Sequence, residues 1–370
     1  MHRVWLLCFV TLMCWACEDG GVSNQALDTN PSDGSIGGDL SSDGDVGGGT
    51  DSMAIHDAAL PDAEPLPGPR AEFQYRPGVE AVTVLGAQPE AHLTLINPMG
   101  RELMTLIADP LGQGHFAYTP DTYGVLDSTG TSGLSLANAQ VLEPGDGYMI
   151  RNDSADPPTW TPRFRVLAVN DIPDASLYEE QTLTGIHFSP ITGADGDPND
   201  GYQYITTRDG VRLGAMVRLP EPVLYGDGPY PTVIEYSGYS PSRPDRISPG
   251  AQIANAVGYA TVSVNMRGTG CSGGVFDFFN RAQHADGYDI VETVARQPWV
   301  LNNQVGMVGL SYPGISQLYV ASTNPPSLAA VVPLSTIADA WEMQWPGGIY
   351  NDGFTANGLK RGSQTPPPEE

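Results

Sequence analysis

Between residues 71 and 172, apolar and polar positions alternate in short runs. This period of two is typical of half-buried β-strands, and no helical periodicity interrupts it. Turns rich in Pro, Gly and Asp separate the runs. We therefore predict a small all-β, sandwich-like domain over residues 71–172. Its expected strands are residues 81–85, 92–96, 103–107, 147–151 and 164–169.

From residue 201 to residue 370 the pattern changes to buried apolar strands that alternate with helical segments. An Asp-Gly turn at residues 209–210 predicts a hairpin between two early strands. The alternation of strands and helices predicts an α/β domain with a mostly parallel sheet. The other expected strands are residues 232–236, 259–265, 305–310 and 329–334, and the expected helices are residues 251–257, 284–297 and 315–321.

The segment VGMVGLSYPGISQ, residues 305–317, is the strongest candidate for chemistry. Ser311 stands between the end of a buried strand and the start of a helix, with Gly309 and Gly314 on either side. This is the pattern of a nucleophile elbow, in which the backbone N–H of the next residue, Tyr312, faces a developing oxyanion. The alternative is an ordinary strand-to-helix turn in which the serine is only an N-cap.

The amino terminus, residues 1–17, has the features of a signal peptide: Arg3, an apolar core too short to span a membrane, and a cysteine-containing end. Ala16-Cys17 followed by two acidic residues indicates a lipoprotein cleavage site with Cys17 as the lipidated residue. Secretion with cleavage nearby is the alternative. Both interpretations place the chain outside the cytoplasm, with membrane attachment only through the lipid.

Residues 18–70 and 173–200 separate these regions. The first is a Gly/Asp/Ser-rich stretch, without Lys or Arg over residues 18–64, and is expected to be a disordered linker; the second is a connection rich in Pro, Asp and Gly. Neither matches the ligand spacing of a calcium loop, and we expect no metal site and no cofactor. The net charge of −26, from 43 acidic and 17 basic residues, argues against nucleic acid as a partner. Cys271 is expected to be a packed, unpaired thiol.

Several strings after residue 200 resemble the Xaa-Pro dipeptidyl-peptidase / cocaine-esterase family of α/β hydrolases. The resemblance covers about residues 201–353 and implies the amino-terminal half of a catalytic domain. It implies that Ser311 is the nucleophile, and that the oxyanion donors are the Tyr312 N–H and the hydroxyl of Tyr239, with Tyr236 as the alternative. The matching strings are TTRDGVRLGAMVRLP, PYPTVIEYSGYSP, GYATVSVNMRGTGCSGG, DGYDIVETVARQPWV, VGMVGLSYPGISQ and PPSLAAVVPLS.

The resemblance also assigns structural roles to Asp286, Asp289 and Trp299, the two carboxylates being expected to cap a helix start. It places the catalytic acid and histidine after the serine, yet none of residues 312–370 is histidine. We therefore expect an incomplete catalytic domain. The leading hypothesis is an extracytoplasmic serine hydrolase acting on small peptides, esters or amides. The alternative is an inactive surface lipoprotein whose β-domain is a binding or spacer module.

Overall fold

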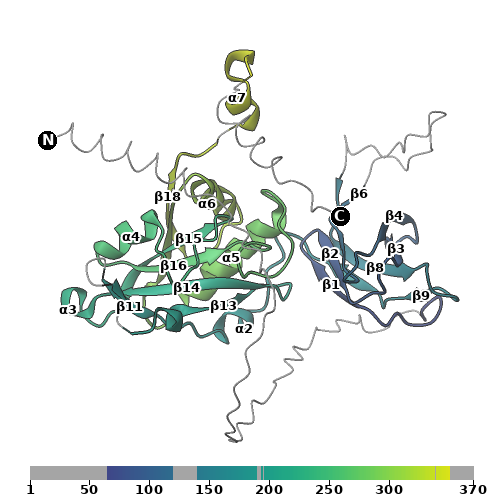
Figure 1. Cartoon of the computed structure of the whole chain (residues 1–370), viewed down its shortest axis with the longest axis horizontal. Helices are drawn as coiled ribbons and strands as arrows, with labels where there is room; N and C mark the ends of the chain where they lie inside the picture. The colour runs from purple at the N-terminus through teal and green to yellow at the C-terminus, as the bar shows by residue number, and fades with distance from the viewer. Residues whose placement is uncertain (1–64, 120–139, 190–192, 195, 338, 351–370) are drawn as a thin grey trace, which may run out of the picture. The chain divides into compact units, whose positions relative to one another are not determined.

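The computed structural model describes residues 65–119, 140–189, 193–194, 196–337 and 339–350 (Figure 1). The predicted signal peptide with Cys17, nearly all of the linker, and the end of the chain lie outside these ranges. Within them, no helix combines the length and apolar character needed to cross a membrane.

The amino-terminal region is built from antiparallel strands, as predicted for residues 71–172. Its sheets have three, five and two strands, and every pairing in them is antiparallel. The predicted strand at residues 164–169 is shorter than expected and ends at Val166. The strands are β1 (Gln74–Gly78), β2 (Ala81–Leu85), β3 (His92–Ile96), β4 (Glu102–Ile107), β5 (Gly114–Phe116), β6 (Tyr118–Thr119), β7 (Gln140–Val141), β8 (Gly145–Asn152), β9 (Thr159–Trp160) and β10 (Phe164–Val166).

One hydrophobic cluster joins the three-stranded and five-stranded sheets of this region. Val82 and Val84 of β2 point into it, as do Leu93 and Leu95 of β3 and Ile150 of β8. All five are fully buried. Alternate residues face the core because successive side chains of a strand point to opposite sides, which is the pattern that predicted these strands.

An eight-stranded mixed sheet forms the second region, in the order β12-β11-β14-β16-β15-β17-β18, with β13 paired to β14. The strands β15, β16, β17 and β18 are parallel to their neighbours in this group. In contrast, β14 is antiparallel to both β13 and β16, because the predicted hairpin reverses the chain. The bounds are β11 (Ile186–Ser189), β12 (Gly193–Ala194), β13 (Tyr202–Thr206), β14 (Arg212–Pro220), β15 (Tyr230–Ser237), β16 (Ala260–Asn265), β17 (Val300–Leu310) and β18 (Leu328–Leu334).

Helices alternate with the parallel strands, and α5 and α6 pack on β17 and on each other (Figure 1). The chain passes from β15 to β16 on one side and then to β17 on the other, so its direction across the sheet switches at β15. Ligands of open α/β sheets bind beyond the carboxyl ends of strands at such a switch. The helices are α2 (Ser176–Glu179), α3 (Pro222–Tyr225), α4 (Pro249–Ala256), α5 (Arg281–Ala295), α6 (Tyr312–Ser322) and α7 (Ala340–Gln344), with short 3₁₀ turns η1 (Pro198–Gly201) and η2 (Pro346–Gly348). This is an α/β-hydrolase type of fold.

The expected capping role of Asp286 and Asp289 is wrong. Helix α5 begins at Arg281, and its N-cap is Asn280, whose side chain accepts a hydrogen bond from the Gln283 N–H. The two aspartates therefore lie in the interior of the helix, where no orphan N–H groups need a cap.

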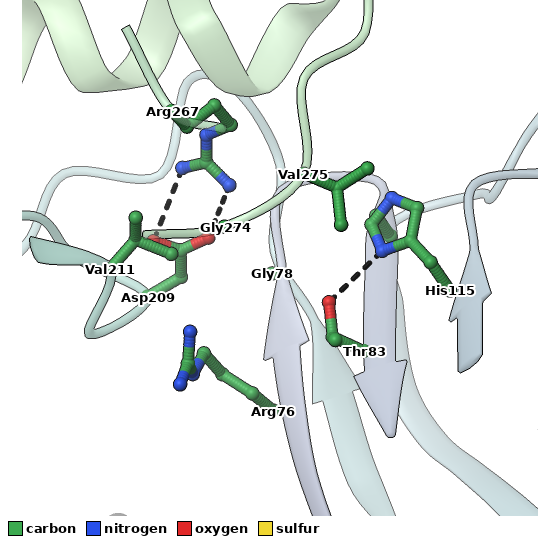
Figure 2. Close-up of a pocket in the computed structure, with 10 residues that line it drawn as sticks. Arg76, Gly78, Thr83, His115, Asp209, Val211, Arg267, Gly274 and Val275 are labelled. Atoms are coloured by element: carbon green, nitrogen blue, oxygen red, sulfur yellow. Dashed lines mark hydrogen bonds and ion pairs between the residues drawn. The ribbon is translucent and has the colours of Figure 1, made fainter. Parts of the chain in front are cut away.

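Instead, the two aspartates bind two buried arginines. Asp289 accepts from Arg208 at 2.8 Å, and Asp286 accepts from Arg267 at 2.8 Å. Arg267 also bonds Asp209 in the β13–β14 turn, as Figure 2 shows. These pairs fix the turn and the end of β16 to α5, so the structural role expected for the two aspartates is confirmed, but through ion pairs rather than caps.

Candidate active site

Ser311 lies at the junction between β17 and α6, in a backbone conformation that L-residues rarely adopt. Its φ is 66° and its ψ is −121°. For a residue with a side chain, this conformation is strained and persists only where the surroundings impose it. The Ser311 N–H donates to the carbonyl of Leu334 on β18, and the Ser311 carbonyl accepts from the N–H groups of Gly314 and Ile315. The turn is therefore fixed by hydrogen bonds on both sides.

The two glycines that flank Ser311 are required by close backbone contacts. A Cβ on Gly309 would lie 2.4 Å from the Pro313 side chain, and a Cβ on Gly314 would lie 2.3 Å from the Leu334 carbonyl oxygen. Both distances are far below those of real Cβ contacts. The spacing of the glycines in the sequence therefore has a steric cause, the sharp return of the chain from strand to helix.

Polar side chains of α6 tie the helix to the strands on either side of β17. Ser316 donates to the Tyr236 carbonyl on β15 at 2.7 Å, and the Gln317 side chain accepts from the Val332 N–H on β18 at 2.7 Å. Both side chains are fully buried. The helix start, and with it the Tyr312 N–H, is thus held in a fixed position behind Ser311.

Tyr239 lies beside Ser311, as the resemblance implied. Its hydroxyl oxygen is 3.3 Å from the Ser311 Oγ, although 72 residues separate the two in sequence. Parallel pairing explains the proximity: β15 and β17 run side by side, with Ile234 opposite Met307, so the segments that follow both strands emerge at the same edge of the sheet. The Tyr239 side chain is 67% exposed and is open to a ligand.

Tyr236, the alternative donor, points into the core. It is fully buried, and its hydroxyl donates to the Gln283 carbonyl at 3.2 Å. Of the two tyrosines, only Tyr239 has its hydroxyl within hydrogen-bonding distance of Ser311.

An aromatic cluster surrounds the Tyr312 ring, and the sequence patterns did not indicate it. Phe276, Phe278 and Phe279 contact the ring at centroid distances of 5.0–6.4 Å, and Tyr239 packs edge-on at 5.7 Å. The run of aromatic residues after the glycine-rich loop is visible in the sequence. The ring that these residues contact, Tyr312, lies more than thirty positions later, so the sequence did not indicate the contact. The cluster shields the Tyr312 side of the turn from water.

The Tyr312 hydroxyl is buried and donates to the side chain of Gln283 at 3.2 Å. Burial raises the pKa of Tyr312 to about 12, with the hydrogen bond to Gln283 acting in the opposite direction. The phenol is thus neutral at physiological pH, and it serves packing rather than proton transfer. The Tyr312 backbone N–H is the first in α6 and therefore has no acceptor within the helix.

No histidine in the described ranges bonds Ser311. His92 is exposed on β3, His115 bonds Thr83 across β5 and β2 (Figure 2), and His187 bonds the Pro220 carbonyl. His284 stacks on Tyr319 at 4.4 Å, and burial lowers its pKa. Among the described residues, Ser311 thus has the Tyr239 hydroxyl beside it and no histidine bonded to it.

The buried aspartates near the site have different protonation behaviour. Burial raises the pKa of Asp286 to about 6, against the attraction of Arg267. Burial also opposes ionisation of Asp209, but the same guanidinium outweighs it and holds the pKa of Asp209 below its ordinary value. Arg267 thus lies between two buried carboxylates, Asp209 and Asp286, and bonds both.

The expectation for Cys271 is wrong, because its thiol is free but exposed. It lies in the loop after β16, where the chain turns through two glycines with positive φ, Gly268 and Gly270. Within the described ranges, no group of three or more His, Cys, Asp or Glu side chains is placed to hold a metal ion.

Comparison with known proteins gives a consistent family for the region around this site. Residues 209–369 match the family model of X-Pro dipeptidyl-peptidase (S15 family). A putative serine esterase of Mycobacterium bovis is 30% identical over 171 residues, which cover 41% of this chain and 27% of that protein. Cocaine esterase of Rhodococcus is 32% identical over 154 residues, covering 40% of this chain and 25% of the relative.

Among solved structures, a CocE/NonD family hydrolase from Staphylococcus aureus is similar at 26% identity and a TM-score of 0.35, covering 39% of this chain and 28% of that one. The chain thus spans about a quarter of the length of the curated relatives it matches. The residues matched by the family model include Ser311. Residues 209–369 thus resemble the X-Pro dipeptidyl-peptidase (S15) family, and the chain is also similar to cocaine esterase over part of its length.

Proposed function

We propose that this chain is a serine hydrolase in which Ser311 forms an acyl-enzyme. The Ser311 Oγ attacks the carbonyl carbon of an ester or amide, the alcohol or amine leaves with a proton, and water then releases the acid. The observation that carries the proposal is the strained Ser311, which directly precedes α6 and whose Oγ lies 3.3 Å from the Tyr239 hydroxyl. A strained serine at a strand–helix turn marks a nucleophile elbow.

Two donors are available for the oxyanion of the tetrahedral intermediate. The Tyr312 N–H is held by the hydrogen bonds of α6. The Tyr239 O–H lies near the Ser311 Oγ, on the segment that follows β15. Donors that are fixed before the reaction stabilise the transition state without reorganisation. In this proposal Tyr239 acts as a hydrogen-bond donor and not as a base.

The proton of Ser311 needs an acceptor, and none of residues 312–370 is histidine. A serine hydrolase with the nucleophile and oxyanion donors, but without its base, keeps only part of its rate. We therefore expect slow acylation of this chain by activated esters and phosphonates. We expect no efficient turnover of amides, whose poorer leaving group depends on a proton donor.

The relatives indicate only the broad class of substrate. The matching proteins are named as a serine esterase, a cocaine esterase and X-Pro dipeptidyl-peptidases. We propose small esters first and X-Pro peptides or amides second. Comparing a nitrophenyl ester with a Gly-Pro nitroanilide, on the same protein preparation, separates the two.

Labelling with a fluorophosphonate tests the nucleophile directly. We expect a single adduct on Ser311, its loss in Ser311→Ala, and a rate lower by on the order of 10² in Tyr239→Phe, because one oxyanion donor is removed. Tyr259→Phe is the matched control, since Tyr259 is also surface-exposed but belongs to another face of the fold. An unlabelled Ser311 on folded protein would refute the enzyme proposal for this chain.

A second candidate function is a non-catalytic surface lipoprotein whose β-domain binds a ligand or acts as a spacer. The observation that favours it is the absence of any bond between Ser311 and a histidine among the described residues. A chain that folds, stays unlabelled and is retained at the cell envelope would support this candidate over the first.

We further propose that the chain is exported and anchored through Cys17. The support is the sequence of residues 1–17 and the linker-like composition that follows. Metabolic labelling with an alkynyl fatty acid tests it: the label is expected on the wild type and on Cys14→Ala, and is expected to be lost in Cys17→Ala. Equal labelling of both variants would place the lipid elsewhere.

A further inference from the structure

The loop between β15 and α4 carries Tyr239, whose hydroxyl lies 3.3 Å from the Ser311 Oγ. The Tyr239 side chain is 67% exposed, and its ring packs edge-on against Tyr312. A side chain with so little packing does not hold its own place, because exposed side chains change rotamer within nanoseconds. The average position of the hydroxyl therefore depends on how firmly the loop backbone is held.

Asn265, the last residue of β16, holds this loop three residues beyond Tyr239. Its amide oxygen accepts from the Ser242 N–H at 2.8 Å, and its amide N–H donates to the Ser242 carbonyl at 3.4 Å. The Asn265 side chain is only 1% exposed. An amide has both a carbonyl and N–H donors, so one neutral side chain satisfies both backbone groups of a residue that has no strand partner.

Ser237, the last residue of β15, holds the loop on the other side of Tyr239. Its hydroxyl oxygen accepts from the Tyr239 N–H at 3.0 Å, and its side chain is fully buried. Ser237 and Asn265 are opposite each other in the register of the two parallel strands, so both supports start from the same edge of the sheet. Between the supports the chain turns through Ser240, whose φ of 54° is strained for serine. Such a turn persists only where its surroundings impose it.

The glycine-rich loop after β16 leaves room for the Asn265 amide. A Cβ on Gly270 would lie 2.4 Å from the Asn265 Nδ2, and the φ of Gly270 is 56°. Both the contact and the backbone conformation favour glycine at this position. The Asn265 amide is thus confined between Gly270 on one side and Ser242 on the other.

The far part of the Tyr239 loop has a separate support. Arg218 of β14 is 1% exposed, and its guanidinium donates to the carbonyls of Arg243 at 2.6 Å and of Arg246 at 3.0 Å. Loss of the Asn265 amide would therefore release the segment next to Tyr239, while the rest of the loop stays bonded to the sheet.

We propose that Asn265 and Ser237 are positioning residues, which fix the loop so that the Tyr239 O–H points at the oxyanion of the tetrahedral intermediate on Ser311. Their hydrogen bonds run to the backbone of Ser242 and Tyr239, so they act through Tyr239 and not on the substrate. The inference rests on the proposed function, in which Tyr239 is an oxyanion donor.

Labelling of the full chain by a fluorophosphonate, measured in two backgrounds, tests this role. Asn265→Ala is expected to lower the labelling rate at least about tenfold in the wild-type background, since removal of a whole donor costs on the order of 10². In the Tyr239→Phe background the same substitution is expected to change the rate by less than about twofold, because the hydroxyl that Asn265 positions is already absent. A purely structural role would lower the rate in both backgrounds.

A milder variant and a matched control accompany Asn265→Ala. Ser237→Ala is expected to show the same dependence on Tyr239, and it keeps the test open if Asn265→Ala does not fold. Asn255→Ala is the control, because Asn255 is also 1% exposed and its amide also donates to a backbone carbonyl, that of Tyr259. It lies in α4, and its loss is expected to leave the labelling rate within about twofold of the wild type.

A second readout needs no reaction at Ser311. In protein with ¹³C-labelled tyrosine, the ring signal of Tyr239 is identified by its loss in Tyr239→Phe. This signal is expected to shift or broaden in Asn265→Ala and in Ser237→Ala, and to stay unchanged in Asn255→Ala.

Three results would overturn the inference. They are equal losses of labelling rate in the two backgrounds, an unchanged rate in folded Asn265→Ala and Ser237→Ala, or an unchanged Tyr239 signal in both variants. A folded wild type that stays unlabelled would instead refute the proposed function, and the Tyr239 signal would still decide whether the two side chains position Tyr239.

Discussion

Replacing Ser311 by glycine is expected to stabilise the protein while removing the proposed nucleophile. The φ of 66° at Ser311 is strained for serine and unstrained for glycine. Strain of this kind amounts to about 1–3 kcal/mol per residue. Glycine loses more backbone entropy on folding, which offsets about 0.5–1 kcal/mol of the gain. We therefore expect Ser311→Gly to raise the free energy of unfolding by about 1 kcal/mol.

Ser311→Ala is the matched comparison, because alanine also lacks the hydroxyl but keeps the strain. It is expected to change stability by less than about 0.5 kcal/mol, since the hydroxyl makes one long contact with an exposed side chain. Urea denaturation followed by far-ultraviolet circular dichroism measures both. In thermal unfolding, the glycine variant should melt about 2–4 °C higher. If Ser311→Gly is no more stable than Ser311→Ala, the turn is not strained, and the steric argument for the elbow fails.

Three further perturbations test the supports of the site. Gly314→Ala is expected to lower stability by about 2 kcal/mol, because overpacking against the β18 carbonyl exceeds the gain in helix propensity. In the control Gly306→Ala on β17, the added Cβ meets only ordinary contacts at 3.5 Å, so this variant should be neutral or slightly stabilising. Arg208→Met leaves the buried Asp289 carboxylate without its arginine and should destabilise the protein by about 3–5 kcal/mol. The control Arg243→Met breaks an exposed ion pair with Asp245 and should change stability by less than about 0.5 kcal/mol. The wild type is expected to lose stability as the pH rises from about 4 to about 6, and Asp286→Asn is expected not to show this loss.

The sign of the last prediction follows from the pKa of Asp286. Its folded value of about 6 lies above the ordinary 3.8, so the folded state holds the proton more tightly than the unfolded state does. Its contribution is fully present below the ordinary value and declines as the pH rises through that window. Chemical denaturation at several pH values measures the slope. A slope identical in wild type and Asp286→Asn would show that Asp286 is ionised throughout.

The same methods decide the other two predictions. An alanine at position 314 that is tolerated as well as one at position 306 would mean that the backbone of β18 can move away from α6. Equal effects of the two arginine substitutions would mean that the buried ion pair contributes no more to stability than the exposed one does.

The local features of the fold were predictable from sequence because they depend on neighbouring residues. The alternation in residues 81–85 and 92–96 identified two strands, and the apolar run with flanking glycines before Ser311 identified the turn. In each case the steric or periodic cause acts within a few residues of the chain. The position of Tyr239 was predictable only through the family resemblance, since its proximity to Ser311 depends on the pairing of β15 with β17.

The errors concern side chains whose partners are distant in sequence. Asp286 and Asp289 were expected to cap a helix, but Arg267 and Arg208 bind them from loops that the sequence does not place. Cys271 was expected to be packed, but it lies in an exposed turn. Charge and polarity identify such residues as notable, but their roles depend on which buried partner the tertiary structure provides.

The placement of α6 has an electrostatic consequence for Ser311. The helix is eleven residues long and largely buried, and its first N–H group is that of Tyr312. Aligned peptide dipoles leave the equivalent of about half a positive charge at a helix start, and a buried helix is little screened by water. The positive potential where an oxyanion would form is thus a property of the backbone. If Ser311 is the nucleophile, as proposed, this part of the charge stabilisation comes from the backbone of α6 and does not depend on any ionisable side chain.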